Sequence, residues 1–340
     1  MPGSSITLPE PGLVISGQKG LAPPATLLAE MTSHDPPGQP ISKRTKLWMA
    51  FAAVYVVWGS TYLAMKLAVA TIPPYLMLGS RFMISGIILY LWARSRGAPA
   101  PARREWRDAA IVGIFLLAGG NGAVGWAVQR TPSGIAALLV ASVPLWMVVI
   151  DWARPHGKRP SLIVAFGLLV GLAGVGVLAL PGGASGNGGA SGIGAIVLIL
   201  GSISWAAGSI YSRHGAHPES AQMFTSLQMI IGSSALLIIG VGAGELGRFH
   251  PSTVTMTSFL GWLYLVTFGS LVGFTAYIYL LRETTPAKAT TYAYVNPIVA
   301  VLLGWAVADE PISPRTIVAA GIILASVAMI SLAGKPAASA

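Results

Sequence analysis

Apolar stretches follow one another almost without interruption from Leu47 to Ala333. Crossing about 30 Å of hydrocarbon takes about 20 helical residues, and ten stretches are about that long. Because backbone groups in lipid must be satisfied within the segment, we predict an all-α polytopic membrane protein with ten transmembrane helices. The predicted helices are Leu47–Ala70, Pro74–Ala93, Arg107–Val128, Ser133–Trp152, Ser161–Leu180, Gly192–Ser212, Ala221–Val241, Met256–Leu281, Pro286–Ala308 and Ser313–Ala333.

The composition agrees with a membrane protein. Of the 340 residues, 54% are hydrophobic and 9% are charged, whereas about a quarter are charged in a soluble domain. The formal charge of +10 comes largely from loops between apolar spans, so we expect it to anchor orientation and expect no nucleic-acid partner. The chain has no cysteine, which excludes disulfides, iron–sulfur clusters and thiolate zinc sites. We expect no metal and no cofactor.

Three polar segments divide the chain. Residues 1–46 are rich in Pro, Ser, Gly and Thr, so we expect a disordered leader; a misassigned start, with Met31 as the true first residue, is the alternative. Residues 181–191 form a Gly/Ser linker and residues 335–340 a tail. The first half (residues 47–180) and the second half (residues 192–334) then hold five predicted helices each.

The two halves resemble each other. Residues 160–167 and 314–321 share a proline, an Ile-Val-Ala run and a glycine. The same offset relates Thr131-Pro132 to Thr285-Pro286. Because five spans is an odd number, the second half must enter the membrane from the opposite side, and we predict an inverted repeat.

Lysine and arginine are unevenly distributed between the two sides of that topology. The segments expected inside carry most of them, and the outer loops retain mainly Arg130, Arg248 and Arg315. By the positive-inside tendency, both termini are expected in the cytoplasm.

Two prolines lie in the middle of corresponding helices. Pro144 and Pro297 each remove a backbone donor, which in lipid is tolerated where protein or water replaces the lost bond. We predict a helix break at each proline, facing a cavity, with Tyr292 and Asn296 beside the second. A fixed kink and a hinge are both compatible with such a break.

Several short motifs occur in order along the chain. They are Trp58-Gly59-Ser60-Thr61, Arg81-Phe82, Pro132 to Pro144, and Asn296-Pro297 followed by Gly304 and Glu310. Residues 47–334 thereby resemble the EamA-type, ten-helix branch of the drug/metabolite transporter superfamily. The resemblance implies a secondary transporter of the bacterial inner membrane that exports small metabolites such as amino acids by alternating access. Gly157 replaces the acidic residue that often matches Glu310 in the first half.

Aromatic and amide side chains are the candidate substrate contacts. Tyr55, Trp58, Tyr62 and Lys66 form one stripe on the first helix, which suits a zwitterion or a planar metabolite through cation–π contact and ion pairing. Packing of the rings and interhelical bonding by the amides are the alternative interpretation. The other candidates are Ser60, Asn121, Trp126, Trp205, Tyr277, Tyr292 and Asn296.

Three charged residues within or near the spans are candidates for coupling or anion contact. We expect Lys66 either to bind the substrate or to extend its amine to the membrane–water interface. We expect Arg81 either to bind an anion or to have a structural role, such as bonding to a neighbouring helix. Asp151 binds a proton if burial raises its pKa; an ordinary pair with Arg154 is the alternative.

Other classes of function have weaker support. Residues 242–247 match a dinucleotide fingerprint, but they follow a predicted membrane helix rather than a strand. The five histidines fall in loops, so we do not expect an enzyme. Broad efflux of drugs or toxic compounds is the alternative within transport, and a receptor or assembly factor is the alternative outside it. The glycines at positions 167, 171 and 174 suit close helix packing or a homodimer interface.

Overall fold

The computed structural model describes residues 42–155, 159–179, 192–212, 215, 218, 220–284 and 291–333. The chain divides into two compact units, Met1–Lys43 and Arg44–Ala340, and the second contains nearly all of these residues. The predicted linker, the tail, Thr285-Pro286 and leader residues 1–41 lie outside the described part.

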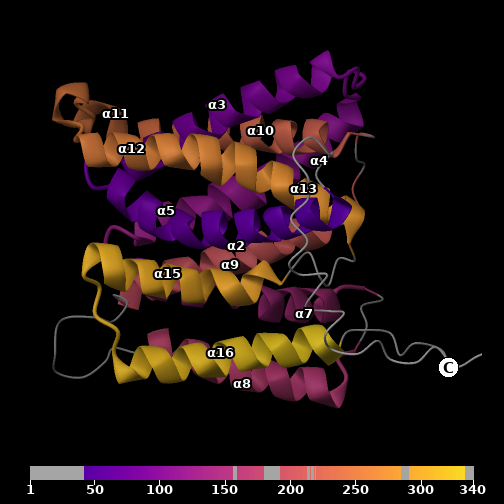
Figure 1. The fold of residues 1–340 in the computed structure, drawn as a ribbon, viewed down its shortest axis with the longest axis vertical. Helices are drawn as coiled ribbons and strands as arrows, with labels where there is room; N and C mark the ends of the chain where they lie inside the picture. The colour runs from indigo at the N-terminus through magenta and orange to yellow at the C-terminus, as the bar shows by residue number, and fades with distance from the viewer. Residues whose placement is uncertain are drawn as a thin grey trace, which may run out of the picture. The chain divides into compact units, whose positions relative to one another are not determined.

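Every regular element in the described part is helical (Figure 1). The helices are α2 (Lys43–Ala68), α3 (Pro74–Ser95), α4 (Arg103–Gly113), η1 (Ile114–Asn121), α5 (Gly122–Ala127), α6 (Ser133–Val140), α7 (Val143–Ala153), α8 (Leu162–Ala179), α9 (Gly192–Ser212), α10 (Ala221–Gly242), α11 (Glu245–Arg248), η2 (Pro251–Thr253), α12 (Met256–Tyr264), η3 (Leu265–Val272), α13 (Gly273–Glu283), α15 (Tyr292–Ala308) and α16 (Pro314–Ala333).

Seven helices in the described residues are long and apolar enough to cross a membrane. Three shorter apolar helices lie at Leu162–Leu178, Val295–Ala308 and Pro314–Ile330. Their outer faces are apolar: on α8, Leu162, Phe166 and Leu169 are all exposed, as expected of side chains that meet lipid. The structure is therefore that of a polytopic helical membrane protein, while the number of spans and the side of the termini stay predictions.

The helix boundaries differ from the prediction at the N-terminal end. Helix α2 begins at Lys43 rather than Leu47, so the last residues of the predicted leader form its first turn. Lysine and arginine are good helix formers, so the helix continues backward through them.

Two long helices contain a π-helical stretch of eight residues. One is η1, between α4 and α5, and the other is η3, between α12 and α13. They fall in the third helix of each half. A π-helix displaces carbonyls from the regular ladder and often occurs at functional sites.

The two prolines behave differently. The α-helix is interrupted at Ala141 and Ser142, and Pro144 lies in the first turn of α7, where no donor is needed. Pro297 lies inside one continuous helix, α15. The predicted break at Pro297 is therefore wrong as an interruption, because the flanking residues keep helical geometry although one backbone bond is lost.

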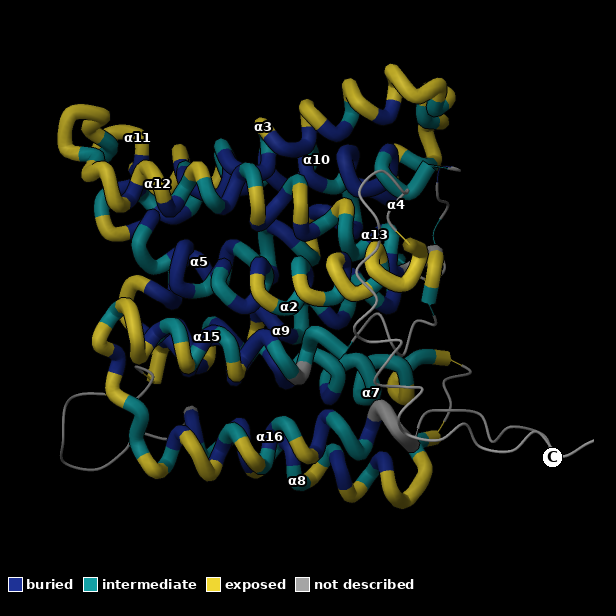
Figure 2. The backbone as a smooth tube through the Cα atoms, in the orientation of Figure 1, coloured by how far each residue is buried: buried dark blue, intermediate teal, exposed yellow. Residues whose placement is uncertain are grey.

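Corresponding helices pack in pairs. Helix α3 packs against α10, and α8 packs against α16. Glycines allow the first pair to approach closely: a Cβ on Gly79 would lie 2.6 Å from Leu237, and one on Gly86 would lie 2.9 Å from Met229. Buried residues on these helices contribute to the main hydrophobic core, and exposed positions recur along α12, α15 and α16 (Figure 2).

Candidate functional site

Four rings from three helices form what we call the aromatic cluster. Trp58 of α2 lies against Phe274 and Tyr277 of α13 and Tyr292 of α15, with ring centroids 5.3, 5.1 and 5.0 Å away. Tyr277 and Tyr292 also meet, edge to face, at 5.6 Å. Such tilted and edge-to-face pairs are the favoured aromatic geometries. Three of the four residues are predicted site residues, and the structure brings them together.

Tyr55 and Asn296 extend this cluster along α2 and α15. The Tyr55 hydroxyl lies 2.6 Å from Thr291 Oγ1. In the orientation that satisfies both ends of its amide, Asn296 Nδ2 donates to the carbonyls of Tyr292 and Tyr55, at 3.2 and 3.3 Å. Asn296 is buried, and its bond to the Tyr55 carbonyl ties α15 to α2 beside the aromatic cluster.

The π-helical stretch η3 supplies an acceptor to the aromatic cluster. Trp58 Nε1 donates to the Gly269 carbonyl at 3.2 Å. Ser85 Oγ likewise donates to the Val266 carbonyl at 3.2 Å. These carbonyls thus accept bonds from other helices, which satisfies polar groups that would be costly in an apolar interior.

Arg81 lies next to the same stretch. Its side chain is buried, and Nε donates to Ser270 Oγ at 3.0 Å. Its Cζ lies 4.5 Å from the centroid of the Phe82 ring, and a Cβ on Gly269 would lie 2.9 Å from its Nη2. Within the described residues, Nη1 is buried without a hydrogen-bond partner. A buried donor without a partner costs about 1–3 kcal/mol, and more when it is charged.

Three predicted contacts lie elsewhere, on α5, η1 and α9. Asn121 Nδ2 donates to the Leu116 carbonyl of its own helix at 3.4 Å. Trp205 lies against Gly120, where a Cβ would come 2.7 Å from the indole ring. Arg130 stacks on Trp126, with Cζ 4.9 Å from the ring centroid. The described contacts therefore do not place these residues in the aromatic cluster.

The remaining polar candidates on α2 make structural contacts. Ser60 Oγ lies 2.7 Å from the Tyr264 hydroxyl, and Tyr62 packs against the main hydrophobic core. Asp151, in α7, pairs with Arg154, three residues further along the chain, and both side chains are 36% exposed. In the part of the chain that the structure describes, no three His, Asp or Glu side chains are grouped so as to hold a metal ion.

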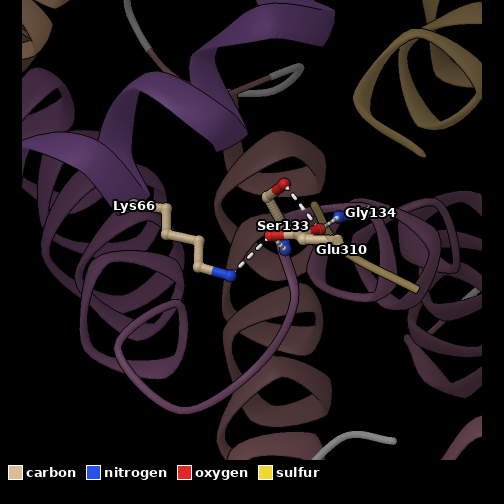
Figure 3. Close-up of polar contacts among 4 residues, drawn as sticks. All are labelled: Lys66, Ser133, Gly134 and Glu310. Carbon is tan, nitrogen blue, oxygen red and sulfur yellow. Dashed lines mark hydrogen bonds and ion pairs between the residues drawn. The ribbon is translucent and has the colours of Figure 1, made fainter. Parts of the chain in front are cut away.

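Lys66 contacts a carboxylate that sequence analysis did not place. Glu310 Oε1 accepts from Lys66 Nζ at 2.6 Å and from Ser133 N at 2.8 Å (Figure 3). Oε2 accepts from Ser133 Oγ at 3.0 Å and from Gly134 N at 3.3 Å. Glu310 thus caps the N-terminus of α6. Glu310 was part of the motif that begins at Asn296-Pro297, but no feature of the neighbouring sequence shows that its partner Ser133 lies 177 residues away.

Burial raises the pKa of Glu310, but the bonds from Lys66, Ser133 and Gly134 outweigh it and hold the pKa below its ordinary value. Its side chain is 7% exposed, whereas that of Lys66 is 34% exposed. We call Glu310, Lys66, Ser133 and Gly134 the carboxylate cluster.

The comparisons with known proteins identify the family. The chain is 40% identical over 287 residues to the inner membrane transporter YedA of Escherichia coli K12, covering 84% of this chain and 90% of that protein. It is 25% identical over 293 residues to the transporter YvbV of Bacillus subtilis, covering 86% and 93%. A crystal structure with 20% identity matches with a TM-score of 0.57, over 85% of this chain and 98% of that one, which shows the fold.

A model of the EamA-like transporter family matches residues 45–180 and, separately, residues 192–332. Together with the relative from the inner membrane and the apolar helices, this makes the chain a multi-pass transporter of the bacterial inner membrane. The chain belongs to the EamA-like transporter family.

Proposed function

We propose that this protein is a secondary transporter that exports small metabolites such as amino acids by alternating access, and that the aromatic cluster contacts the substrate. The observation that carries the proposal is the meeting of Trp58, Tyr277 and Tyr292 from three helices. Two of those helices lie in the second matched stretch and one lies in the first. A substrate bound there would contact both parts of the carrier.

The chemistry of this region suits a zwitterion. The faces of Trp and Tyr attract an ammonium group by cation–π contact. The Arg81 guanidinium, whose Nη1 lacks a described partner, suits the carboxylate. Arg81 lies beside Gly269, the residue that Trp58 contacts, so the two halves of an amino acid would be recognised by neighbouring groups.

The transport cycle in this proposal follows from the internal repeat. Ten spans in two inverted sets, with both termini in the cytoplasm, would let the halves expose the aromatic cluster to each side in turn. The double match to the family model supports the repeat. The interruption before Pro144 and the two π-helical stretches are the points where helices depart from regular geometry.

A proton is the proposed coupling ion, and Asp151 is the proposed proton acceptor. Asp151 lies in α7, and protonation would release it from Arg154. Asp151→Asn should then abolish uptake driven by a pH gradient while exchange without a gradient persists. Unchanged dependence on the gradient would remove Asp151 from the mechanism.

The test is uptake of radiolabelled amino acids into proteoliposomes of the purified protein, with and without a pH gradient. Trp58→Ala should abolish saturable uptake. Trp48→Ala is the matched control because Trp48 lies on the same helix and is 66% exposed; its uptake should equal that of wild type.

The aromatic cluster also favours planar organic cations, the substrates of the second candidate function, broad drug efflux. If a planar cation shows saturable uptake and no amino acid does, amino acids are refuted as substrates and drug efflux is favoured. If folded protein carries neither class, transport of both is refuted and a receptor or assembly role takes its place.

A further inference from the structure

The Glu310 carboxylate joins the two halves of the chain. It belongs to the second half, but its four described bonds all come from residues of the first: Lys66 Nζ, Ser133 N, Ser133 Oγ and Gly134 N. Lys66 lies at the end of α2, and Ser133 and Gly134 begin α6. One side chain therefore fastens α2 and α6 to the segment that follows α15.

The backbone turns sharply just before Glu310. Asp309 has a φ of 51°, the one positive value of a non-glycine residue in the described chain. A left-handed residue commonly ends a helix, and Asp adopts this conformation more readily than most L-residues do, so Asp309 ends α15 with a sharp turn. The Glu310 N–H donates to the Gly304 carbonyl at 3.0 Å, which closes the turn and returns the side chain toward α6.

Helices α6 and α15 also touch closely at this end. A Cβ on Gly134 would lie 2.8 Å from the Cα of Val301. A Cβ on Gly304 would lie 2.9 Å from Ser133 Oγ. The two glycines thus let α6 and α15 approach closely at this end, where an added Cβ would meet Val301 or the side chains of Ser133 and Glu310.

The sequence of the first half has no acidic residue at the corresponding position, which lies outside the described residues. The position that matches Glu310 in spacing from the proline is Gly157, which has no carboxylate. Asp151, the nearest acid, pairs with Arg154 of its own segment. A glutamate at this position is therefore present in the second half and absent from the sequence of the first half.

We propose that Glu310 is a latch that holds one end of the carrier closed and releases Lys66 and α6 each time that end opens. The inference rests on the alternating access proposed above, in which the halves separate at each end in turn. A contact made in one state only shifts the population toward that state. Lys66 is then a positioning residue that acts through Glu310.

The absence of cysteine from the chain provides a clean test. A reporter, Ala137→Cys, lies on α6 three residues after Gly134, so it shares the face that meets α15, and Ala137 is 1% exposed. Its rate of labelling by a membrane-impermeant maleimide reports opening. Measurement in both spheroplasts and inside-out vesicles makes the result independent of which side that end faces.

Lys66→Met removes the ion pair but leaves the bonds of Glu310 to α6 intact. It should speed labelling of the reporter roughly five- to thirtyfold, the factor equivalent to one or two kcal/mol. Lys66→Arg keeps the charge and should restore slow labelling. Glu310→Gln should speed labelling as well, because an amide pairs poorly with Lys66.

Glu245→Gln is the matched control. Glu245 is also buried, and it caps α3 by accepting from Tyr75 N at 3.3 Å and Leu76 N at 2.9 Å. Like Glu310 it joins the second half to the first, but its described bonds reach α3 and neither α6 nor α15, so its substitution should leave the labelling rate of the reporter on α6 unchanged. A rise equal to that of Glu310→Gln would indicate general loosening and overturn the latch.

Slow labelling in both Lys66→Met and Glu310→Gln, from protein that elutes as wild type does in size exclusion, would also refute the latch. If Glu310→Gln does not fold, the labelling rates of Lys66→Met and Lys66→Arg alone test the latch. Labelling needs no substrate, so the two proposals fail separately. Active transport with unchanged labelling removes the latch alone, and faster labelling without transport removes the substrate assignment alone.

Discussion

Trp58 donates its ring N–H to the carbonyl of Gly269, 3.2 Å away in the π-helical stretch η3. A parallel contact occurs on the other side of the repeat, where Ser204 Oγ donates to the Phe115 carbonyl of η1 at 2.8 Å. The first helix of each half therefore bonds to the π-helical stretch of the other half. This exchange places a donor from one half against displaced carbonyls of the other, next to the aromatic cluster in the case of Trp58.

Asn296→Ala should weaken transport more than it weakens the fold. It removes bonds to two backbone carbonyls, worth about 1 kcal/mol each, and shifts Tyr292 in the aromatic cluster. We expect at least a fivefold loss of uptake in proteoliposomes with a small change in melting temperature. Ile298→Ala, at an exposed position of the same helix, is the control. Loss of folded protein would instead assign Asn296 to packing.

Arg81→Gln should reduce recognition of carboxylates. Loss of a charge-assisted bond costs about 1.5–3 kcal/mol, so uptake of an amino acid should fall roughly ten- to hundredfold, while that of its amide analogue changes little. The measurement is competition of each compound against labelled substrate. Ser270→Ala removes the Nε partner but keeps the charge, and should have a smaller effect. Equal losses for acid and amide would mean that Arg81 does not bind the carboxylate.

The stabilising effect of Glu310 should depend on pH. Its pKa lies below the ordinary 4.5 in the folded protein, so its contribution is full above that value and is lost as pH falls through the folded pKa. The difference in melting temperature between wild type and Glu310→Gln in detergent should be largest near pH 7 and shrink below about pH 4. A difference that is constant over this range would contradict an ionised Glu310.

Gly304→Ala should destabilise the protein. The added methyl would lie 2.9 Å from Ser133 Oγ and 3.0 Å from Glu310 Cδ, so the contact between α6 and α15 must widen. Overpacking of this kind costs about 1–3 kcal/mol, measurable as a lower melting temperature. Gly321→Ala is the control because nothing lies within 4 Å of its Cβ position; it should be neutral or stabilising. Equal melting temperatures for the two variants would refute the close contact.

Sequence patterns predicted the helices well where an apolar stretch has a sharp boundary. Helix α3 begins at Pro74 and α9 covers Gly192–Ser212, both as expected, because proline, glycine and polar loops mark such ends locally. The interruption between α6 and α7, next to Pro144, also has a local cause.

The features that sequence analysis missed depend on distant contacts. No preference of individual residues predicts the π-helical stretches. The continuity of α15 through Pro297 depends on the packing of that helix. The motif drew attention to Glu310, but its partners are 177 and 244 residues away. Trp58, Tyr277 and Tyr292 were predicted as separate candidates, and their meeting required the fold.

A π-helical stretch holds one more residue than the α-helix that would otherwise fill the same place. Removing a single residue between Leu265 and Val272 would thus restore the ordinary register. Because an α-helix would then fill the same place, the residues after it would keep their direction around the helix axis. Tyr277 would then still face Trp58, but the carbonyls that accept from Trp58 and Ser85 would return to the regular ladder. The extra residue of η3 therefore sets which carbonyls are available to other helices, rather than where the tyrosine points.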